Sequence, residues 1–414
     1  MTRRFWTIFL SGLLLTVLTP AIRAEETNNC LTCHQQIEEE DGPAHKFPRD
    51  IHYQKGIFCV DCHGGDASLD DMDAVRKVKG YRGAPSHLEV PEFCARCHSD
   101  ATYMRNHNPS LPTDQLEKYK TSIHGKRLFG EKDTKVANCI SCHSVHEIGD
   151  AKMPYSSTYP MNIPGTCGKC HADSSYMAPY NIPTDQLDKY TRSVHGKALL
   201  VKKDLGAPAC NSCHGNHGAA PPGVASLSAV CGNCHALQAD LFNASPHEKA
   251  FAANNYPMCE TCHSNHLIEH PTDSLVGTKP PALCANCHSD DDGTKGFAVA
   301  EGSLASIEEL VQHRAVADSL LLDAHDKGMM TTDEEFKLRE VDQDLIETRT
   351  LVHSLDLTKL QPKAQEGLAK ADTVKVRSAG LIDEYYYRRK GLGLATLFIT
   401  IAAIGLYLKI RKLR

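Results

Sequence analysis

The stretch SVHGKALLVKKDLGAPACNSCHGNH, residues 193–217, contains the motif around which the whole chain is organised. It includes a C-x-x-C-H motif ending at His214, the attachment signature of a c-type haem, in which two thiols add to the vinyl groups of the haem. The motif histidine then binds the iron as its proximal ligand. His195 precedes the motif by fifteen residues and His217 follows His214 by three. An iron held by imidazole on both faces suits electron transfer and leaves no position for a substrate.

The motif occurs nine times and accounts for all 18 cysteines. Zinc sites and disulfide frameworks also use paired cysteines, but neither requires a histidine directly after every second cysteine. We therefore predict nine covalently attached c-type haems with iron, one per motif. The predicted attachment residues are Cys30, Cys33, Cys59, Cys62, Cys94, Cys97, Cys139, Cys142, Cys167, Cys170, Cys210, Cys213, Cys231, Cys234, Cys259, Cys262, Cys284 and Cys287. The predicted proximal ligands are His34, His63, His98, His143, His171, His214, His235, His263 and His288.

Each haem has little polypeptide to cover it. Residues 25–300 provide about 31 residues per motif, so the haems must pack against one another and form much of the apolar interior. The expected fold is mainly α with much irregular structure, organised around packed haems. The formal net charge of −6 gives no basic footprint for nucleic acid.

An internal repeat predicts the second iron ligands. Residues 113–128, TDQLEKYKTSIHGKRL, match residues 184–199, TDQLDKYTRSVHGKAL, at 11 of 16 positions. In both copies an S-x-H-G histidine comes before a C-x-x-C-H motif, and another histidine follows at C-H-x-x-H. A shorter and a divergent copy divide the chain into four two-haem units plus a ninth haem at Cys284. The predicted distal ligands are His52, His87, His124, His146, His195, His217, His247 and His266.

The ninth distal ligand is not marked by the repeat. In a helical hairpin turning near residue 330, His313 and His353 lie toward the end where the chain enters, and we prefer one of these two. His45, His270 and His325 are other candidates, and an iron with one open face is the alternative. His107 falls in a two-residue insertion of one repeat copy and is expected at the surface.

Residues 301–390 form a separate helical tail. They contain no cysteine, and apolar residues recur at three-four spacing. The pattern predicts one helix that ends near Gly328 and a second that opens with a Thr332-x-x-Glu335 capping box. A third helix is expected after Pro362, a residue suited to a first turn. We interpret the tail as antiparallel helices that cover haem surface or space the haem domain from a membrane.

Two apolar segments predict export and anchoring. Residues 1–24 have a positive start, an apolar run and small residues near a cleavage site, as in a signal peptide. Residues 391–408 form an uncharged run of 18 residues, long enough for one transmembrane helix, and residues 409–414 follow as a short cytoplasmic tail. Because c-type haem is attached outside the cytoplasm, residues 25–300 belong on the periplasmic side of a bacterial cytoplasmic membrane. The C-terminus then lies in the cytoplasm.

The S-x-H-G and C-x-x-C-H-x-x-H elements resemble the multihaem cytochromes c, a superfamily that includes tetrahaem cytochromes, pentahaem nitrite reductase and octahaem hydroxylamine oxidoreductase. The resemblance covers residues 30–288 and implies haem pairs, stacked parallel or perpendicular, that form a chain for electrons. The catalytic haem of nitrite reductase has a C-x-x-C-K motif, whereas every motif here ends in histidine. No tyrosine can be matched to the cross-linked tyrosine of hydroxylamine oxidoreductase, so the catalytic activities are not carried over.

The sequence therefore predicts a membrane-anchored periplasmic electron carrier. The expected partners are redox proteins: a quinol-oxidising membrane subunit, since the anchor has no histidine or acid of its own, and a periplasmic or outer-membrane cytochrome. The alternative is an oxidoreductase that acts on a small nitrogen or sulfur oxyanion at one five-coordinate haem. The haem of His288 is the first candidate for that role and the haem of His34 the second.

Overall fold

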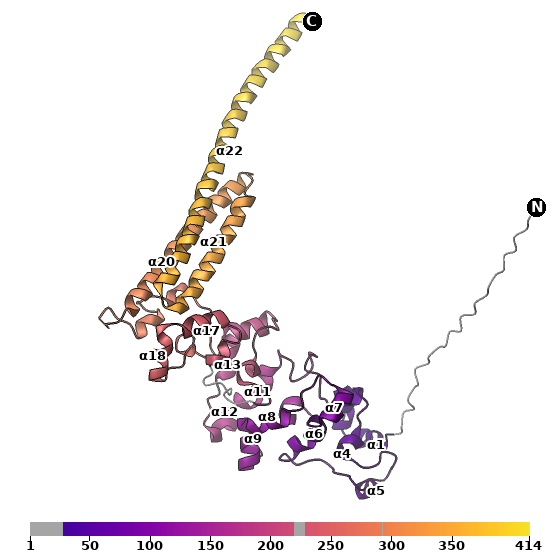
Figure 1. Cartoon of the computed structure of the whole chain (residues 1–414). Helices are drawn as coiled ribbons and strands as arrows, with labels where there is room; N and C mark the ends of the chain where they lie inside the picture. Colours follow the sequence, from indigo (N-terminus) through magenta and orange to yellow (C-terminus); the bar gives the residue numbers. More distant parts are fainter. Residues whose placement is uncertain (1–27, 219–227, 292) are drawn as a thin grey trace, which may run out of the picture. The chain divides into compact units, whose positions relative to one another are not determined.

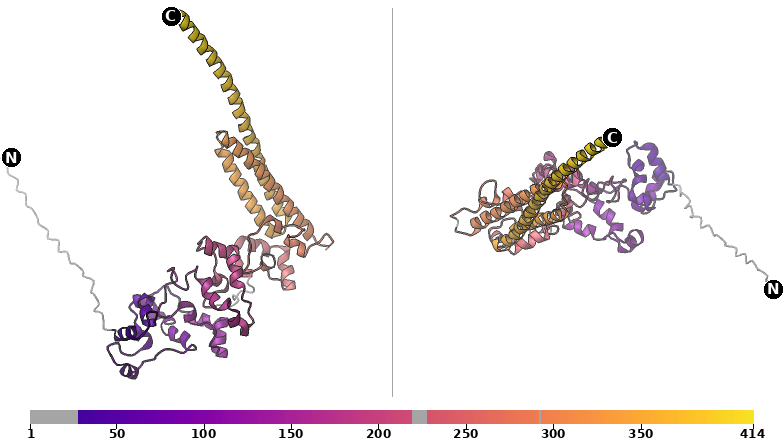
Figure 2. Two further views of the ribbon diagram at one scale, coloured as in Figure 1. Left: turned by 180° about the vertical axis from the view of Figure 1, so that it is seen from behind. Right: turned by 90° about the horizontal axis from the view of Figure 1, so that it is seen from above.

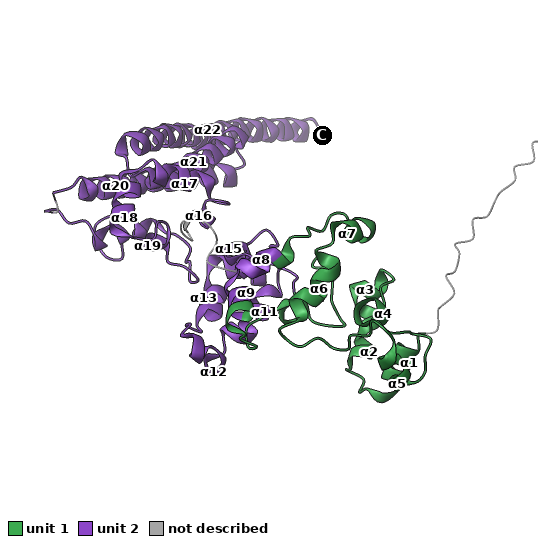
Figure 3. Cartoon of the chain, turned by 60° about the horizontal axis from the view of Figure 1, so that its bottom comes forward, with its two compact units in different colours: residues 1–116, 128–157 green, residues 117–127, 158–414 purple. Residues whose placement is uncertain are grey.

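The computed structural model of the chain describes residues 28–218, 228–291 and 293–414 (Figure 1). Within these residues the chain forms helices and irregular segments and no strand, which confirms the expected mainly α class. The predicted signal peptide lies outside the described residues. The chain divides into two compact units, residues 1–116 with 128–157 and residues 117–127 with 158–414 (Figure 3).

The helices before residue 290 are short. They are α1 (Asn29–Ile37), α2 (Pro43–Lys46), α3 (Ile51–Gln54), α4 (Cys59–His63), α5 (Met72–Lys77), α6 (Val90–His98), α7 (Ala101–His107), α8 (Gln115–Thr121), α9 (Ile123–Lys126), α10 (Cys139–His143), α11 (Ile163–His171), α12 (Ser174–Met177), α13 (Gln186–Arg192), α14 (Val194–Gly196), α15 (Cys210–His214), α16 (Ser228–Cys231), α17 (Ala236–Asn243), α18 (Pro246–Asn254) and α19 (Glu260–His263). Short 3₁₀ or π turns join them: η1 (Phe47–Arg49), η2 (Arg127–Glu131), η3 (Ala178–Tyr180), η4 (Lys197–Val201), η5 (Asp273–Leu275) and η6 (Leu283–Asn286).

This haem-motif region has a sparse side-chain core. Of the 25 buried apolar side chains in the described residues, eleven lie before residue 290, although this region makes up more than two thirds of the chain. Helices of one or two turns are marginal in water unless other groups pack on them. The haems predicted at the nine motifs would fill this interior.

The end of the chain is a three-helix bundle of α20 (Gly296–Asp326), α21 (Thr332–Leu351) and α22 (Leu357–Leu413), with η7 (Val352–Ser354) between the last two. The three helices lie side by side in both further views (Figure 2). Small residues on α22 allow close packing, because a Cβ added at Gly367 would lie 3.0 Å from the methyl groups of Leu310. The buried core of the bundle consists of Ile307, Leu310, Ala317, Leu321, Leu338, Val341, Leu345, Leu368, Ala371 and Val374.

The structure corrects two predicted helix starts. The N-cap of α21 is Thr331, not Thr332, and the Thr331 hydroxyl donates to the Glu335 carboxylate at 2.7 Å instead of capping a backbone N–H. α22 begins at Leu357, ahead of Pro362, because the Asp356 carboxylate accepts the backbone N–H of Thr358 at 2.9 Å and fixes the first turn there.

α22 continues without a break into the apolar run, so the predicted tail and the predicted anchor share one helix of 57 residues. Among the residues that the structure describes, α22 is the one helix long and apolar enough to cross a membrane. Residues 391–408 are exposed throughout, as expected for a segment whose partner is lipid.

Candidate haem sites

The S-x-H-G element is a helix start that fixes its histidine in place. The buried Ser122 hydroxyl donates to the carbonyl of Tyr119 at 2.6 Å and accepts the N–H of Gly125 at 2.9 Å. A Cβ at Gly125 would lie 1.9 Å from the same carbonyl, so the chain at this point accepts only glycine without moving. The second copy repeats this arrangement at Ser193. The motif therefore holds His124 and its counterpart rigidly.

Seven proximal histidines lie with their rings opposite a second histidine ring. The pairs, with the distance between ring centroids, are His98 with His52 (5.9 Å), His63 with His146 (6.1 Å), His171 with His124 (6.1 Å), His214 with His266 (5.9 Å), His235 with His195 (6.2 Å), His263 with His353 (6.0 Å) and His288 with His247 (5.9 Å). A metal–imidazole bond is about 2 Å long, so two rings on opposite faces of one iron have centroids about 6 Å apart. The spacing fits one haem iron between each pair.

Most of the second histidines in these pairs do not face the motif that lies beside them in the sequence. His52 precedes the second motif but faces His98 of the third, and His124, His195 and His247 likewise each skip one motif forward. The histidines of C-H-x-x-H skip one motif back: His146 follows the fourth motif and faces the second, and His266 follows the eighth and faces the sixth. Neighbouring two-haem units are therefore interlocked, a feature that spacing along the chain does not reveal.

At two matching positions of the repeat, a backbone hydrogen bond joins the segment before a C-x-x-C-H motif that carries one distal histidine to the segment that follows a C-H-x-x-H histidine. The N–H of Ile51, beside His52, donates to the carbonyl of Ile148 at 2.8 Å, and the N–H of Val194 donates to the carbonyl of Ile268 at 2.9 Å. In both cases the two histidines of these segments face the proximal rings of neighbouring motifs. The structural repeat therefore extends over four motifs, whereas the sequence indicated a repeat of two.

Hydrogen bonds at Nδ1 orient several of these rings and leave Nε2 for the iron. His63 Nδ1 donates to the carbonyl of Gly83 at 2.7 Å, and His353 Nδ1 donates to the carbonyl of Thr350 at 2.9 Å. His52 Nδ1 lies 2.9 Å from a carboxylate oxygen of the buried Asp50. Burial opposes ionisation of this carboxylate, but hydrogen bonds from His52 and from the backbone N–H of Ile148 hold the pKa of Asp50 below its usual range.

The first haem site has a carboxylate beside its proximal ligand. Glu38 accepts a hydrogen bond from His34 Nδ1 at 2.7 Å with one oxygen and from the backbone N–H of Ala44 at 2.8 Å with the other. His45 follows directly, and its buried Nε2 has no hydrogen-bond partner among the residues that the structure describes. A buried nitrogen of this kind calls for a ligand such as a metal. His45 is therefore a candidate distal ligand for the first haem.

Other predicted ligands are placed differently. His87 uses Nε2 to donate to the carbonyl of Val136 at 2.8 Å, and the structure pairs it with no proximal ring in the described residues. His143 and His217 both take part in interactions, and their roles as proximal and distal ligand remain predictions. His107 packs on the ring of Tyr103 at 4.3 Å.

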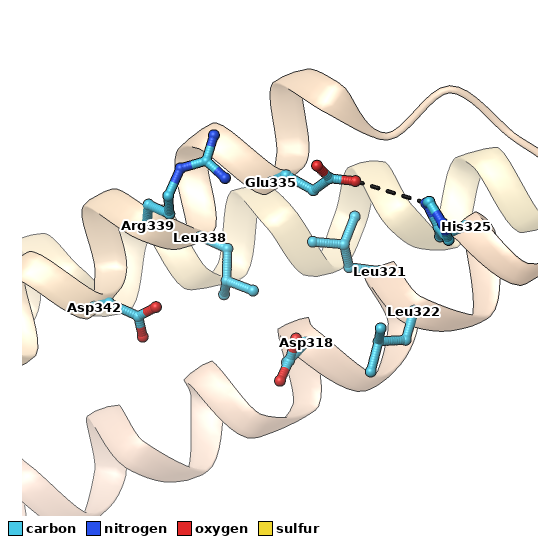
Figure 4. A pocket seen from close by; sticks show the side chains of 8 residues that line it. All are labelled: Asp318, Leu321, Leu322, His325, Glu335, Leu338, Arg339 and Asp342. Atoms are coloured by element: carbon cyan, nitrogen blue, oxygen red, sulfur yellow. Dashed lines mark ion pairs between the residues drawn. The ribbon is translucent and has the colours of Figure 1, made fainter.

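The sequence offered five candidates for the ninth distal ligand; besides His45, they are His270, His313, His325 and His353. His313 pairs with Asp372 of α22 at 2.9 Å, and His270 Nδ1 donates to the carbonyl of Pro271. His325 lies 3.7 Å from a carboxylate oxygen of Glu335 in a shallow groove between α20 and α21 (Figure 4). His353 faces a proximal ring, but that ring belongs to the eighth motif.

Cysteines of successive motifs lie near each other within each of the two compact units. Hydrogen bonds join the first cysteines of three motif pairs: Cys94 with Cys139, Cys167 with Cys210, and Cys231 with Cys259. The first thiols of motifs one and two, Cys30 and Cys59, also interact electrostatically. At the intervening junctions the second cysteine of one motif interacts electrostatically with cysteines of the next: Cys62 with Cys97, Cys213 with Cys231 and Cys234, and Cys262 with Cys284 and Cys287. Burial and the neighbouring Cys97 raise the pKa of the Cys62 thiol to about 11.

These interactions indicate an order for the predicted haems within each of the two compact units. Since each thiol bonds to one edge of a haem, adjacent thiols place the edges of successive haems together. Haems attached in this way would follow the order of the chain within motifs one to four and within motifs five to nine.

Comparison with known proteins agrees with this arrangement. The family model for cytochrome c3 matches residues 51–172, the doubled CXXCH motif matches residues 246–293, and the model for cytochrome c554 and c-prime matches residues 15–64. The chain is a multihaem c-type cytochrome. The cytochrome is 23% identical over 269 residues to multiheme cytochrome MtrA of Shewanella baltica, which covers 63% of this chain and 74% of MtrA.

A second relative is C-type polyheme cytochrome OmcC of Geobacter sulfurreducens, 24% identical over 165 residues. That match covers 34% of this cytochrome and spans only 20% of OmcC. No solved structure matches the chain.

Glu38→Gln is expected to raise the reduction potential of the first haem by tens of millivolts. The carboxylate strengthens electron donation from His34 and stabilises the ferric iron, and an amide does so less. A tenfold change in the relative stability of two one-electron states corresponds to about 59 mV. A spectroelectrochemical titration measures the shift. Glu39→Gln, at an exposed neighbouring position, is the control, and an equal shift in both variants would rule out a specific effect.

Proposed function

We propose that this cytochrome is a membrane-anchored electron carrier of the bacterial periplasm that passes electrons along its nine haems. The observation that supports the proposal is the order of the predicted haem attachment sites, in which cysteines of successive motifs lie close enough to form hydrogen bonds or to interact electrostatically. Edge-to-edge contact between successive haems is the arrangement that electron tunnelling needs. A carrier also needs no substrate site, and the seven pairs of facing histidine rings support two histidine ligands for each of seven irons.

The paired histidines also set the potential range. Axial ligand identity is a main determinant of haem potential, and histidine on both faces gives low values. Low potentials suit exchange with the quinol pool or with another multihaem cytochrome. We propose a quinol-oxidising membrane subunit as donor and a periplasmic or outer-membrane cytochrome as acceptor.

The proposed membrane anchor is the exposed part of α22. Its uncharged run of 18 residues between basic flanks has the length and composition of a single membrane span. Because c-type haem is attached outside the cytoplasm, a single membrane span would place the C-terminus in the cytoplasm. The parallel rings of His247 and His288, with an interplanar angle of 6°, support a second histidine ligand for the ninth haem and so favour the carrier over the oxyanion-converting enzyme.

Haem content provides the first test. Mass spectrometry of the mature protein is expected to show nine haem additions and no free thiol, because all 18 cysteines lie in nine motifs. The oxidised protein should be low-spin and reducible in full by dithionite. Eight or fewer haems in a fully matured sample would disprove the count, and a dominant high-spin signal would favour the enzyme.

Truncation tests the anchor. Ending the chain after Asp383 is expected to release a soluble cytochrome with an unchanged haem spectrum, because the bundle core of the described residues ends near Ser378. Fractionation of cells that express the two forms measures the difference. A truncated form that remained in the membrane fraction would show that another segment or a partner holds the protein there.

A further inference from the structure

We infer that the α20–α22 bundle is a rigid stalk that holds the haems of motifs eight and nine about 50 Å above the bilayer. The partner at this end is then a protein whose own redox group stands in the aqueous phase, and not a quinol dissolved in the membrane. The inference rests on the proposed membrane span and specifies the kind of partner that the span permits.

The eighth and ninth haem sites lie at one end of the bundle. His353, directly before α22, faces His263 of the eighth motif at 6.0 Å. His288 of the ninth motif packs against the first residue of α20, since a Cβ on Gly296 would lie 2.2 Å from its ring. Arg349 of α21 reaches Asp273 through two hydrogen bonds, of 2.7 and 2.8 Å. Both haem sites are therefore fixed to the same end of the stalk.

The opposite end of the bundle lies next to the predicted membrane surface. The turn between α20 and α21 brings the Lys327 ammonium over the rings of Tyr385 and Tyr386 of α22, at 6.0 and 5.8 Å from their centroids. Tyrosine favours the interface between water and lipid. Five residues after Tyr386, the apolar run begins at Gly391.

The helix length gives the height. Leu357 and Gly391 are 34 residues apart on one continuous helix, which at a rise of 1.5 Å per residue corresponds to about 51 Å. The 31 residues of α20 give an independent length of about 46 Å. A tilt of 40°, the upper end of the usual range for membrane helices, still leaves about 39 Å.

The packing indicates that the stalk is stiff. Between the ends, α22 buries an uninterrupted stripe that includes Ala364, Leu368, Ala371 and Val374. The buried carboxylate of Asp344 on α21 pairs with two lysines of α22, Lys363 at 3.0 Å and Lys370 at 2.7 Å. Separating the helices would leave the buried Asp344 carboxylate without its partners, so these contacts resist separation.

The height excludes direct exchange between quinol and the haems of motifs eight and nine. Tunnelling rates fall exponentially with distance, and about 40–50 Å separates the haems of motifs eight and nine from the bilayer surface. Residues 296–390 contain no cysteine and therefore no further haem attachment site. Electrons from the membrane therefore reach these two haems through a partner protein whose own redox group lies near the haem-bearing end of the stalk.

Neutron reflectometry on the full-length cytochrome in a supported phospholipid bilayer tests the height. We expect a sparse layer about 40–50 Å thick between the bilayer and a dense haem-containing layer. The chain ended after Asp383 is the control and should form no layer. In proteoliposomes that contain an isoprenoid quinol, the haems should stay oxidised for minutes and then be reduced at once by dithionite.

The outcomes separate the two proposals. Dense protein directly on the bilayer, or reduction of the haems by the quinol alone within seconds, would overturn the stalk while leaving the anchor intact. Failure of the full-length protein to bind the bilayer would overturn the anchor, and the stalk with it.

Discussion

Replacing His353 by alanine is expected to open the sixth position of one iron while all nine haems stay attached. His353 lies 6.0 Å from the proximal ring of His263, and its Nδ1 is held by the carbonyl of Thr350, so that Nε2 is available for the iron. The thioether bonds at Cys259 and Cys262 do not depend on this ligand. The ferric spectrum should show one high-spin haem in nine, and carbon monoxide should bind to that haem in the reduced protein.

The potential of the altered haem should rise as well. A strong imidazole ligand is exchanged for water or for none, which disfavours the ferric state. A rise on the order of 0.1 V is a modest part of the roughly 0.8 V range over which axial ligands set haem potentials. The eighth haem would then trap electrons, and transfer between a donor at one end of the chain and an acceptor at the other should slow.

His313→Ala is the matched control for this experiment. His313 lies on the same bundle, and its replacement removes the ion pair with Asp372, a partly exposed interaction worth about 1 kcal/mol or less. No haem change is expected. A spectral change in His313→Ala combined with an unchanged His353→Ala would show that the assignment of the bundle ligand is wrong.

The sequence identified the positions of most paired histidines but not the iron that each one faces. The repeat shows that His124 and His195 are equivalent, because their surroundings match residue by residue. It cannot show that each skips one motif, since that depends on how haem units pack in three dimensions. His353 illustrates the limit further: its place at the bundle end was predicted, and yet it faces the eighth motif and not the ninth.

Local chemistry could have improved one prediction. The first copy of the S-x-H-G element has Asp50 where the others have serine, and Asp50 caps the helix by accepting the backbone N–H of His52 at 2.8 Å. Aspartate and serine are both preferred N-caps, so the divergent first copy keeps the cap of the element with a different residue. His87, with Pro85 and Ser86 before it, has no such surroundings, and its Nε2 is bonded to a carbonyl instead.

The bundle was predicted in outline because its apolar period is regular. The hairpin turn near residue 330 and the apolar positions Leu338, Val341 and Leu345 follow from three-four spacing, and the structure buries all three. The continuity of α22 was not predicted. At residue 390 the composition changes from mixed to apolar, which marks a change of solvent, but helix propensity stays high and the backbone does not break.

Gly125→Ala is expected to displace a distal ligand without touching it. The added Cβ would lie 1.9 Å from the carbonyl of Tyr119, a backbone atom that cannot move aside by rotating, so the start of α9 must shift. Insertion of a methyl group into a packed site costs about 1–3 kcal/mol. Because His124 directly precedes Gly125, its ring should move away from His171 and leave the fifth haem partly high-spin.

Thermal unfolding and the intensity of the high-spin ferric signal measure the two effects together. Gly130→Ala is the control five residues further on, where an added Cβ meets nothing within 4 Å. This substitution should leave the spectrum unchanged and stabilise the protein by about 0.4–1 kcal/mol through the unfolded state. The repeat supplies a second instance, since a Cβ at Gly196 would also lie 1.9 Å from a carbonyl, that of Tyr190, and Gly196→Ala should affect the seventh haem in the same way. A low-spin spectrum in both Gly125→Ala and Gly196→Ala would mean that the S-x-H-G element does not position iron ligands.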